Sequence, residues 1–286
     1  MKQKQTARVL SQKEIAPDIC DMWIETSLAG EIVPGQFIGV YPKDKSTLLP
    51  RPISICEAGA FPAEYLRKTE EMRETEFGCA GEPNVGHTMG KAAIRIVYRI
   101  AGAGTREFSR YCPGDTIDIL GPLGNGFPTE KGRGKKVFLM GGGIGIPPML
   151  ELAKQMECGK KQIVAGYRDA HIFLKEEFEQ NGELYISTED GSVGTKGNVL
   201  DAIRENGLDA DIIFACGPTP MLRAIKEFAK EKKIACYISL EERMACGIGA
   251  CLGCVCRTKE RDPHTNVHNA RICKDGPVFL STEVEI

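Results

Sequence analysis

The chain has 286 residues, a length that is typical of about two domains. It is 42% hydrophobic and 27% charged, which is close to the globular average and disfavours disordered or collagen-like structure. The 37 Lys and Arg residues against 39 Asp and Glu give a net charge of −2, whereas a protein that reads nucleic acid is more often basic. No apolar run approaches the roughly 20 residues of a bilayer span, and residues 1–5 begin no apolar signal core. We therefore expect a cytoplasmic protein without nucleic-acid or membrane partners.

The first third of the chain predicts a small antiparallel β-barrel. Short apolar runs at 6–10, 19–25 and 36–41 are separated by proline and glycine, and residues 94–100 and 115–120 alternate with a period of two. One segment, from 57 to about 91, interrupts this pattern. Its residues 62–73 have helical composition with charges at i,i+4 spacing, which indicates a surface excursion between two strands.

From about Lys135 the pattern changes to strands alternating with helices. We expect strands at 137–140, 162–167, 184–187 and 212–215, and helices at 147–155, 172–179, 198–205 and 221–230. Such alternation is typical of βαβ units on a parallel sheet. The block from about Leu240 is short and rich in Cys and Gly. The predicted fold is therefore a multi-domain α/β protein with an N-terminal antiparallel β-barrel (1–128), a Rossmann-like parallel sheet (129–238) and a small C-terminal domain (239–286).

The cysteines carry the most specific signal. Of 12 in the chain, Cys246, Cys251 and Cys254 follow the C-x4-C-x2-C spacing of plant-type [2Fe–2S] proteins, with Cys273 further on. Glycines between them let a loop wrap closely around a cluster. Zinc also takes four thiolates, but zinc ribbons favour paired C-x2-C knuckles. Zinc and unligated structural cysteines remain the alternatives. For the fourth ligand we favour Cys273 over Cys256, whose thiol would have to double back over Cys254.

A glycine-rich turn follows the first strand of the predicted parallel sheet. It contains Gly141, Gly142, Gly143 and Gly145, and Pro147 suits the first turn of the next helix. Glycines permit close approach of a dinucleotide pyrophosphate, and a helix N-terminus supplies N–H donors. Because the motif is not G-x-G-x-x-G, a plain strand-to-helix turn is the alternative.

A second turn, Cys216-Gly217-Pro218, also comes at the carboxyl end of a predicted strand. Ligands of open α/β sheets bind at those ends, so Cys216 could lie near a nicotinamide ring. The alternative is a small buried thiol with a packing role.

In the barrel, Arg51-Pro52-Ile53-Ser54 and Gly104-Thr105 form a third candidate pair. The Arg51 guanidinium offers a fork of donors to a phosphate. Thr105 would cap a short helix at 106–111 and leave first-turn N–H groups for a second phosphate oxygen. Taken alone, these residues could equally be an ordinary strand and turn. Residues 121–127 read as the turn that leaves the barrel, either a plain linker or a ligand contact.

No catalytic acid–base group stands out. The chain has four histidines, and neither His87 nor the pair His264 and His268 has the spacing of a nucleophile's base or a metal pair. No G-x-S-x-G anchor for a Ser-His-Asp hydrolase is present. We expect these histidines to be solvated loop residues.

The order of these motifs resembles the ferredoxin-NADP+ reductase superfamily. More closely, residues 239–251 and 273–279 are similar to the electron-transfer subunits of dihydroorotate dehydrogenase B. The resemblance covers nearly the whole chain except about 57–91. The C-terminal cysteine motif is its specific part, and the other motifs are shared by many flavin reductases.

The resemblance implies three cofactors, one for each predicted domain: FAD on the barrel, NAD on the Rossmann-like domain and a [2Fe–2S] cluster at the C-terminus. For FAD it implies Arg51, Pro52, Ile53, Ser54, Val97, Tyr98, Arg99, Gly104 and Thr105. For NAD it implies Gly141, Gly142, Gly143, Gly145, Cys216, Gly217 and Pro218. For the cluster it implies Cys246, Cys251, Cys254 and Cys273.

It also implies an oxidoreductase subunit of pyrimidine biosynthesis. An FMN-containing partner would oxidise dihydroorotate to orotate, and electrons would pass through the cluster and FAD to NAD+, in a heterotetramer of two plus two subunits. A nicotinamide takes a hydride whereas a cluster passes single electrons, so a flavin must lie between them. The carboxylates of Glu189 and Asp190 favour NAD over NADP, because they would bond a ribose diol and repel a 2′-phosphate.

Two other readings stay open. The same cofactors could serve the equivalent subunit of another anaerobic complex, such as a sulfhydrogenase or a ferredoxin-dependent NADPH enzyme. A non-enzymatic, metal-binding redox sensor with an inactive reductase fold is the second alternative, and it would bind no flavin.

Overall fold

The computed structural model describes residues 3–63, 65, 90–261 and 266–286, with the side chain of residue 3 excepted. Most of the predicted excursion at 57–91, with its helical segment and His87, lies outside the described residues, as does His264. The chain forms two compact units. Residues 1–32 and 37–123 make the first unit, and residues 33–36 and 124–286 make the second.

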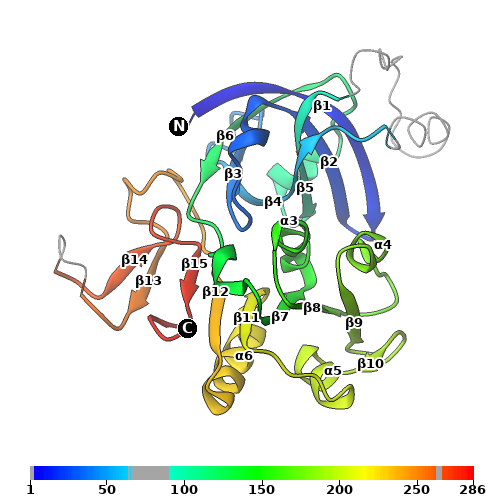
Figure 1. Ribbon diagram of the computed structural model, residues 1–286. Coiled ribbons are helices and arrows are strands. Elements are labelled where there is room, and N and C mark those ends of the chain that lie inside the picture. Colours follow the sequence, from blue (N-terminus) through cyan, green and yellow to red (C-terminus); the bar gives the residue numbers. More distant parts are fainter. Residues whose placement is uncertain (1–2, 64, 66–89, 262–265) are drawn as a thin grey trace. The chain divides into compact units, whose positions relative to one another are not determined.

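The first unit is a closed antiparallel barrel with the strand order β1-β2-β5-β4-β3-β6, as predicted (Figure 1). Its strands are β1 (Gln3–Ala16), β2 (Ile19–Glu25), β3 (Phe37–Tyr41), β4 (Arg51–Ala60), β5 (Ala92–Arg99) and β6 (Thr116–Leu123). The period-two pattern of β5 shows which of its side chains face the barrel core. Ile94, Ile96 and Tyr98 lie in the barrel core, because successive strand side chains point to opposite faces.

The second face of β5 is buried too. Arg95 is only 2% exposed and forms an ion pair with the fully buried Asp21 of β2, with 2.9 Å between Arg95 Nη2 and Asp21 Oδ2. The Tyr65 hydroxyl lies 3.3 Å from the same carboxylate, and Trp23 packs edge-on against the Tyr65 ring. A buried charge requires such a partner. The outer wall of the barrel is therefore covered at this point.

The barrel unit also contains the 3-10 helix η1 (Ser27–Glu31) and the short helix α2 (Ala103–Phe108). The prediction of a helix at 106–111 capped by Thr105 is wrong. The helix begins at Ala103 with Gly102 as its N-cap, and Thr105 is its third residue. The Thr105 hydroxyl accepts hydrogen bonds from the N–H groups of Ala101 and Gly102, at 2.9 and 3.2 Å, so it closes the turn from inside the helix.

The second unit contains a seven-stranded sheet in the order β10-β9-β8-β7-β11-β12-β15. Its strands are β7 (Lys136–Gly142), β8 (Lys160–Tyr167), β9 (Glu183–Thr188), β10 (Thr195–Lys196), β11 (Ile212–Cys216), β12 (Ala235–Ser239) and β15 (Val278–Leu280). All pairs are parallel except that of β12 with β15. From β7 the chain builds first toward β8 and later toward β11. The boundary between β7 and β11 is therefore the switch point at which ligands of such sheets bind.

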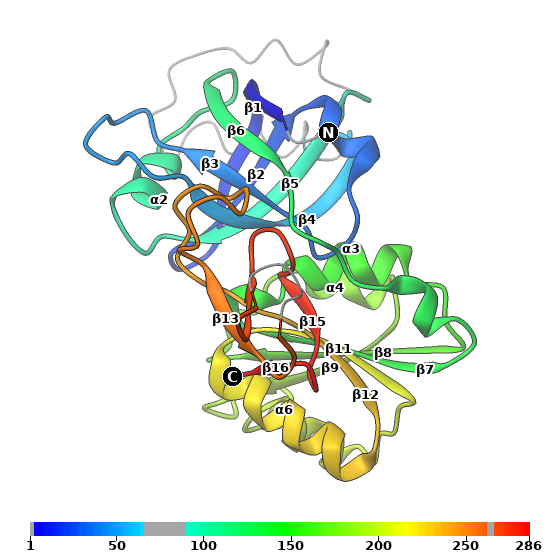
Figure 2. The same ribbon diagram turned by 90° about the vertical axis from the view of Figure 1, so that its left-hand side faces the viewer.

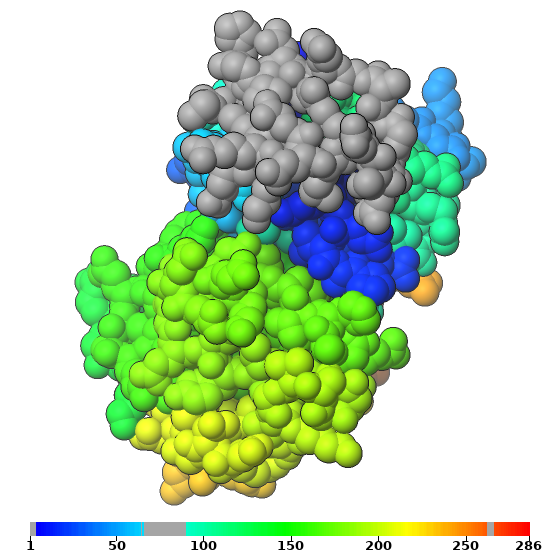
Figure 3. All heavy atoms as spheres, turned by 90° about the vertical axis from the view of Figure 1, so that its right-hand side faces the viewer, coloured from blue at the N-terminus to red at the C-terminus, as the bar shows by residue number. Residues whose placement is uncertain are grey.

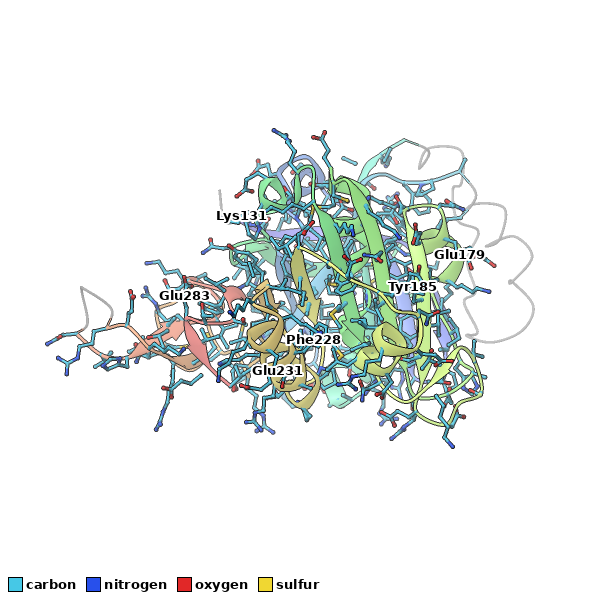
Figure 4. The ribbon with its side chains drawn as sticks, turned by 60° about the horizontal axis from the view of Figure 1, so that its bottom comes forward. Lys131, Glu179, Tyr185, Phe228, Glu231 and Glu283 are labelled. Carbon is cyan, nitrogen blue, oxygen red and sulfur yellow. The ribbon has the colours of Figure 1, made fainter. Side chains whose placement is uncertain are left out.

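Helices flank this sheet. They are α3 (Pro148–Gln155), α4 (Lys175–Glu179), α5 (Val199–Glu205) and α6 (Thr219–Lys232), with the 3-10 helices η4 (Thr129–Gly132) and η5 (Gly143–Gly145). Figure 2 shows α3 and α4 on one face of the sheet and α6 on the other. Figure 3 shows the segments coloured green to yellow as one closely packed surface. In Figure 4, Phe228 and Glu231 mark α6, and Tyr185 marks β9.

The helix at 172–179 was predicted too long, because α4 begins only at Lys175. Leu174, just before it, has a φ of +61°, a left-handed conformation that cannot continue a helix backwards. None of the described helices is long and apolar enough to cross a bilayer.

The C-terminal residues add a three-stranded sheet in the order β14-β13-β16. Its strands are β13 (Val255–Thr258), β14 (Asn269–Arg271) and β16 (Val284–Glu285). The short segment 33–36 packs with this second unit as well. The Phe127 N–H donates to the Pro34 carbonyl at 2.7 Å, and the Gln36 amide donates to the Gly124 carbonyl at 2.9 Å.

Candidate functional site: a cysteine loop and a nucleotide edge

The first two cysteines of the motif lie on an exposed loop whose backbone turns toward their sulfur atoms. The N–H groups of Ile248, Ala250 and Cys251 lie 3.5, 3.3 and 3.4 Å from Cys246 Sγ, and the Gly253 N–H lies 3.4 Å from Cys251 Sγ. Burial opposes ionisation, but these donors outweigh it and lower the pKa of Cys246 to about 6. The loop is therefore built to hold thiolates.

Glycine is required where this loop curls. Gly249 has a φ of +86°, and a Cβ there would lie 2.9 Å from the Lys274 side chain. Its N–H also donates to the Cys273 thiol. The Gly249 turn is thus the point at which the first cysteine loop meets the second.

The other two cysteines form a second, buried pair. Cys254 is 2% exposed and Cys273 is fully buried. Burial and the neighbouring Cys254 thiol, with which it is hydrogen-bonded, raise the pKa of Cys273 to about 12. The Ile272 N–H donates to the Cys254 carbonyl at 2.8 Å, which keeps the two segments side by side.

Two pairs of thiols suit a two-iron cluster, in which each iron takes two cysteine ligands. Cys256 belongs to neither pair. It lies in β13 opposite Ala270, and burial raises the pKa of its thiol to about 11. This geometry favours Cys273 as the fourth ligand.

The glycine turn after β7 and the Cys216 turn after β11 meet at the switch point of the sheet. Cys216 pairs with Gly141 in the strand register. A Cβ on Gly145 would lie 2.5 Å from both the Cys216 carbonyl oxygen and the Gly217 nitrogen, which no structure tolerates without backbone movement. The two predicted nicotinamide motifs are therefore in backbone contact. The helix after the turn starts one residue later than predicted, with Pro147 as N-cap and Pro148 at N1.

Cys216 itself is a buried thiol. Its pKa is raised by burial and by the Glu241 carboxylate, while its hydrogen bond to Ser239 acts in the opposite direction. A thiol with a raised pKa stays protonated and is a poor nucleophile. Cys216 can therefore line a ligand site, but its environment does not activate it for covalent chemistry.

The predicted ribose-binding carboxylates lie at the same edge of the sheet, after β9. Both Glu189 and Asp190 are exposed. The Asp190 carboxylate accepts hydrogen bonds from the Ser192 N–H at 2.9 Å and the Ser192 hydroxyl at 2.7 Å, and these bonds lower its pKa. Asp190 therefore shapes the turn, and Glu189 is the better placed of the two for a ribose diol.

In the barrel unit, Arg51 of β4 lies across the start of α2. Its Nε atom is 2.9 Å from the position of a Cβ on Gly104, so only glycine lets the guanidinium approach the helix this closely. Arg51 also donates to the Leu49 carbonyl at 2.5 Å. The structure thus brings Arg51 beside Gly104, which lies more than 50 residues later in the sequence.

The remaining barrel residues of the prediction lie on β4 and β5. Ile53 is buried in the barrel core. So is Tyr98, whose hydroxyl accepts a hydrogen bond from Gln12 at 2.9 Å and whose ring packs edge-on against Phe108. Pro52 and Arg99 are exposed, Ser54 is half-buried and Val97 is buried. Tyr98 could therefore offer a ligand only its backbone.

The predicted solvated histidine that the structure describes is indeed exposed. His268 is exposed and accepts a hydrogen bond from Arg261 Nε at 3.2 Å. Two residues near the cysteines escaped the sequence analysis, Asn125 and Arg271. Both contact the turn that carries Cys273.

Comparison with known proteins settles the family. Over 292 residues and 99% of both chains, the sequence is 40% identical to the electron transfer subunit of dihydroorotate dehydrogenase B (NAD(+)) from Geobacillus sp. (strain WCH70). The chain belongs to the dihydroorotate dehydrogenase B electron transfer subunits. The subunit of Bacillus cereus (strain G9842) is 39% identical over 290 residues, again with 99% of both chains covered.

The cysteine region has its own family match. Residues 241–285 match the family described as the iron–sulfur cluster binding domain of dihydroorotate dehydrogenase B. This span includes all four predicted cluster ligands. The family prediction and the iron–sulfur prediction for this region are confirmed.

Solved structures agree on the fold. An NADH-dependent reduced ferredoxin-NADP oxidoreductase matches with a TM-score of 0.76 and 28% identity, covering 98% of this chain and 89% of that one. A ferredoxin NADP+ reductase from Neisseria gonorrhoeae matches with a TM-score of 0.60 and 15% identity, covering 84% and 94% of the two chains. The predicted fold class, with its antiparallel barrel and parallel α/β sheet, is confirmed.

Proposed function

We propose that this dihydroorotate dehydrogenase B electron transfer subunit carries electrons between an FMN-containing catalytic subunit, which oxidises dihydroorotate to orotate, and NAD+. The observation that carries the proposal is the two-plus-two arrangement of the four cysteines, inside a domain of the iron–sulfur family and in a chain related to such subunits over its whole length. A heterotetramer of two plus two subunits and a cytoplasmic location remain predictions.

The cluster ligands in this proposal are Cys246 and Cys251 for one iron and Cys254 and Cys273 for the other. Backbone N–H groups point at the sulfur atoms of Cys246 and Cys251, where they can donate to cluster ligands. The first pair lies on an exposed loop and the second is buried. The exposed side of the loop is therefore where electrons from another protein can enter.

For NAD, we propose that the pyrophosphate lies on the Gly141, Gly142, Gly143 and Gly145 turn. The turn includes η5 and leads into α3, where the N–H groups of Met149 and Leu150 donate to the carbonyls of Ile146 and Pro147 at 3.0 Å. The proposed site therefore depends on the close approach that the glycines of the turn permit. Cys216, Gly217 and Pro218 form the adjoining wall at the switch point. Glu189 at the far end of the edge would accept hydrogen bonds from a ribose diol, which favours NAD over NADP.

For FAD, we propose the barrel residues around Arg51. The guanidinium offers two or more donors in a fixed fork, and it lies against Gly104 at the start of α2. Pro52, Ile53 and Ser54 continue the same strand. The backbone of Val97, Tyr98 and Arg99 on β5 completes the proposed set.

A flavin supplies the exchange between single electrons and a hydride, which neither a nicotinamide nor an iron–sulfur cluster supplies alone. The residues assigned here bind and orient the cofactors, and none has to move a proton. This division explains why the proposed site contains glycines, cysteines and one arginine rather than a catalytic histidine or a carboxylate pair.

The test is a cofactor and activity inventory of the full chain, purified without oxygen. We expect two irons, two acid-labile sulfides and one FAD for each chain, together with NADH oxidation by an artificial acceptor. Mixed with an FMN-containing dihydroorotate dehydrogenase subunit, the chain should couple dihydroorotate oxidation to NAD+ reduction. Colourless protein without iron and flavin would refute the proposal and leave the redox-sensor reading.

One observation favours a second candidate partner. The similar NADH-dependent reduced ferredoxin-NADP oxidoreductase structure covers almost the whole chain at 28% identity. A subunit of such a complex would bind the same cofactors, so cofactor content cannot separate the two. The discriminating result is the protein that copurifies: an FMN subunit active on dihydroorotate supports the first proposal, and a larger ferredoxin-linked subunit supports the second.

A further inference from the structure

The turn that carries Cys273 is closed on itself by its backbone. The N–H groups of Lys274, Asp275 and Gly276 lie 3.0, 2.7 and 3.3 Å from the carbonyl oxygen of Arg271, which accepts from all three. Cys273 lies inside this turn, so whatever fixes the turn also fixes the direction of its thiol. Two side chains contact the turn from outside its backbone.

The first is Arg271. Its Nε and Nη2 atoms lie 2.9 and 3.1 Å from the two carboxylate oxygens of Asp275, and its own N–H donates to Asp275 Oδ2 at 2.8 Å. This two-pronged ion pair spans the base of the turn. Arg271 also contacts a residue outside this turn. Its Nη1 atom lies 3.4 Å from the Gly249 carbonyl oxygen in the first cysteine loop.

The second is Asn125, from the 121–127 segment that the sequence leaves open between a linker and a ligand contact. Its side-chain amide donates to the Asp275 carbonyl at 3.0 Å and to the Lys274 carbonyl at 3.3 Å. Its backbone N–H donates to the Gly276 carbonyl at 2.6 Å. Three consecutive carbonyls of the Cys273 turn are therefore tied to one residue almost 150 positions earlier in the chain.

We propose that Asn125 and Arg271 are positioning residues for the iron–sulfur site, which together hold the Cys273 turn so that its thiol stays beside Cys254. The inference rests on the cysteine assignment of the proposed function. It gives the segment 121–127 a defined role, which is to hold the turn of Cys273, the fourth cluster ligand.

The two residues act in different ways, which makes them separable. Asn125 is neutral and exposed, and it contributes hydrogen bonds only. Arg271 is partly buried, and its charge balances Asp275 close to the cluster. Loss of Asn125 should loosen the ligand without changing the local charge. Loss of Arg271 should also remove the positive charge that pairs with Asp275, and a net gain of negative charge near a cluster lowers its reduction potential.

The experiment uses the full chain with its cofactors reconstituted. Its readouts are the rate at which a chelator removes iron, followed by the visible absorbance, and the cluster reduction potential. The variants are Asn125→Leu, which keeps the approximate volume but donates nothing, and the pair Arg271→Gln and Arg271→Lys. The matched control is Asn198→Leu, because Asn198 is also exposed in the second unit and its side chain accepts from the Leu200 N–H at 2.9 Å.

We expect Asn125→Leu to release iron about five to ten times faster than the native chain, the effect of one or two hydrogen bonds. Its potential should stay unchanged, and Asn198→Leu should release iron at the native rate. Arg271→Gln should both release iron faster and lower the potential. Arg271→Lys should restore the potential but not iron retention, because an ammonium cannot span both Asp275 oxygens and Gly249.

Native iron-release rates in both Asn125→Leu and Arg271→Gln would overturn the positioning role, as would equal acceleration in the Asn198→Leu control. Full rescue of iron retention by Arg271→Lys would show that charge alone matters and would overturn the geometric role of Arg271. Failure of the proposed function is distinguishable, because the native chain itself would then bind no cluster.

Discussion

The contact between the two nicotinamide turns can be tested with a single methyl group, by replacing Gly145 with Ala. The added Cβ would lie 2.5 Å from the Cys216 oxygen and the Gly217 nitrogen and 2.6 Å from the Cys216 carbonyl carbon. These are backbone atoms, so no side chain can rotate away. Ordinary contact begins at about 3.4 Å, so the two turns must separate by roughly 1 Å, and overpacking of this kind costs about 1–3 kcal/mol.

The direction of the change in stability distinguishes a clash from an ordinary glycine-to-alanine substitution. Gly145 does not have a left-handed φ, so alanine is compatible with its backbone. A glycine-to-alanine change without a clash usually stabilises a protein by about 0.4–1 kcal/mol. Gly145→Ala should instead lower the Tm by roughly 2–10 °C, and a turn displaced by about 1 Å should raise the KM for NADH at least tenfold.

The assay is NADH oxidation by ferricyanide, together with thermal unfolding. Gly30→Ala is the matched control, because nothing lies within 4 Å of a Cβ at Gly30. It should keep the native KM and show a native or slightly raised Tm. Both variants should retain FAD and iron. A Gly145→Ala protein with native KM and Tm would refute the packing argument and the placement of NAD at this turn.

Further predictions concern the other sites. Cys273→Ser should abolish the visible cluster absorbance whereas Cys256→Ser should keep it, and the reverse result would reassign the fourth ligand. Arg51→Gln should lose FAD on gel filtration with little change in iron content, measured by flavin fluorescence and iron analysis; unchanged FAD retention would remove Arg51 from the flavin site. NADPH should support far slower ferricyanide reduction than NADH, and Glu189→Gln should narrow the difference; comparable native rates would exclude the proposed NAD preference. Burial raises the pKa of Glu107, but bonds from the Tyr111 hydroxyl and the N–H groups of Lys43 and Asp44 outweigh it, so the pKa is lowered on folding. The contribution of Glu107 to the free energy of unfolding is therefore present above the pKa of the unfolded chain, near 4.3. It is lost as the pH falls through the lower pKa of the folded chain. Glu107→Gln should reduce the loss of Tm between about pH 5 and pH 3. A variant whose Tm falls over this range as much as that of the native chain would contradict this.

The sequence predicted the strand framework well because its signals are local. Period-two alternation along 94–100 corresponds to β5, and the apolar runs of the second unit correspond to β7, β8, β9 and β11. The cysteine spacing was equally local, since three of the four cysteines lie on one loop. Each of these features can be read without knowing what the segment packs against.

Local sequence signals do not reveal features that tertiary contacts decide. Gly102 caps α2 without a side chain, so the hydroxyl of Thr105 was the more visible signal and placed the helix start too late. Strand β12 went unpredicted because only two residues separate it from the charged C-terminal end of α6, so its short apolar run was not set apart from the helix. The alternation along 94–100 does not explain the burial of Arg95, which follows from the position of Asp21 on the neighbouring strand.

The positioning residues of the cysteine site, Asn125 and Arg271, could not be predicted because their role depends on tertiary contacts. Asn125 and the turn at 271–276 are almost 150 residues apart, and no spacing rule connects them. The one signal in the sequence was the Gly-rich stretch 121–127, which was equally compatible with a plain linker and with a ligand contact. That signal indicates a constraint on the backbone but does not say which segment imposes it.

The segment 33–36 has a consequence for anyone who wishes to dissect this protein. The polypeptide passes between its two units after residues 32, 36 and 123, so neither unit is one continuous stretch of chain. A fragment starting at Gly124 would lack the Pro34 carbonyl that receives the Phe127 N–H, and Gly35, against which the Phe127 ring and Val278 lie. A fragment ending at Leu123 would contain residues 33–36 without the residues of the second unit that they contact. A fragment that is to carry the iron–sulfur site without the barrel would therefore need residues 33–36 in addition to 124–286.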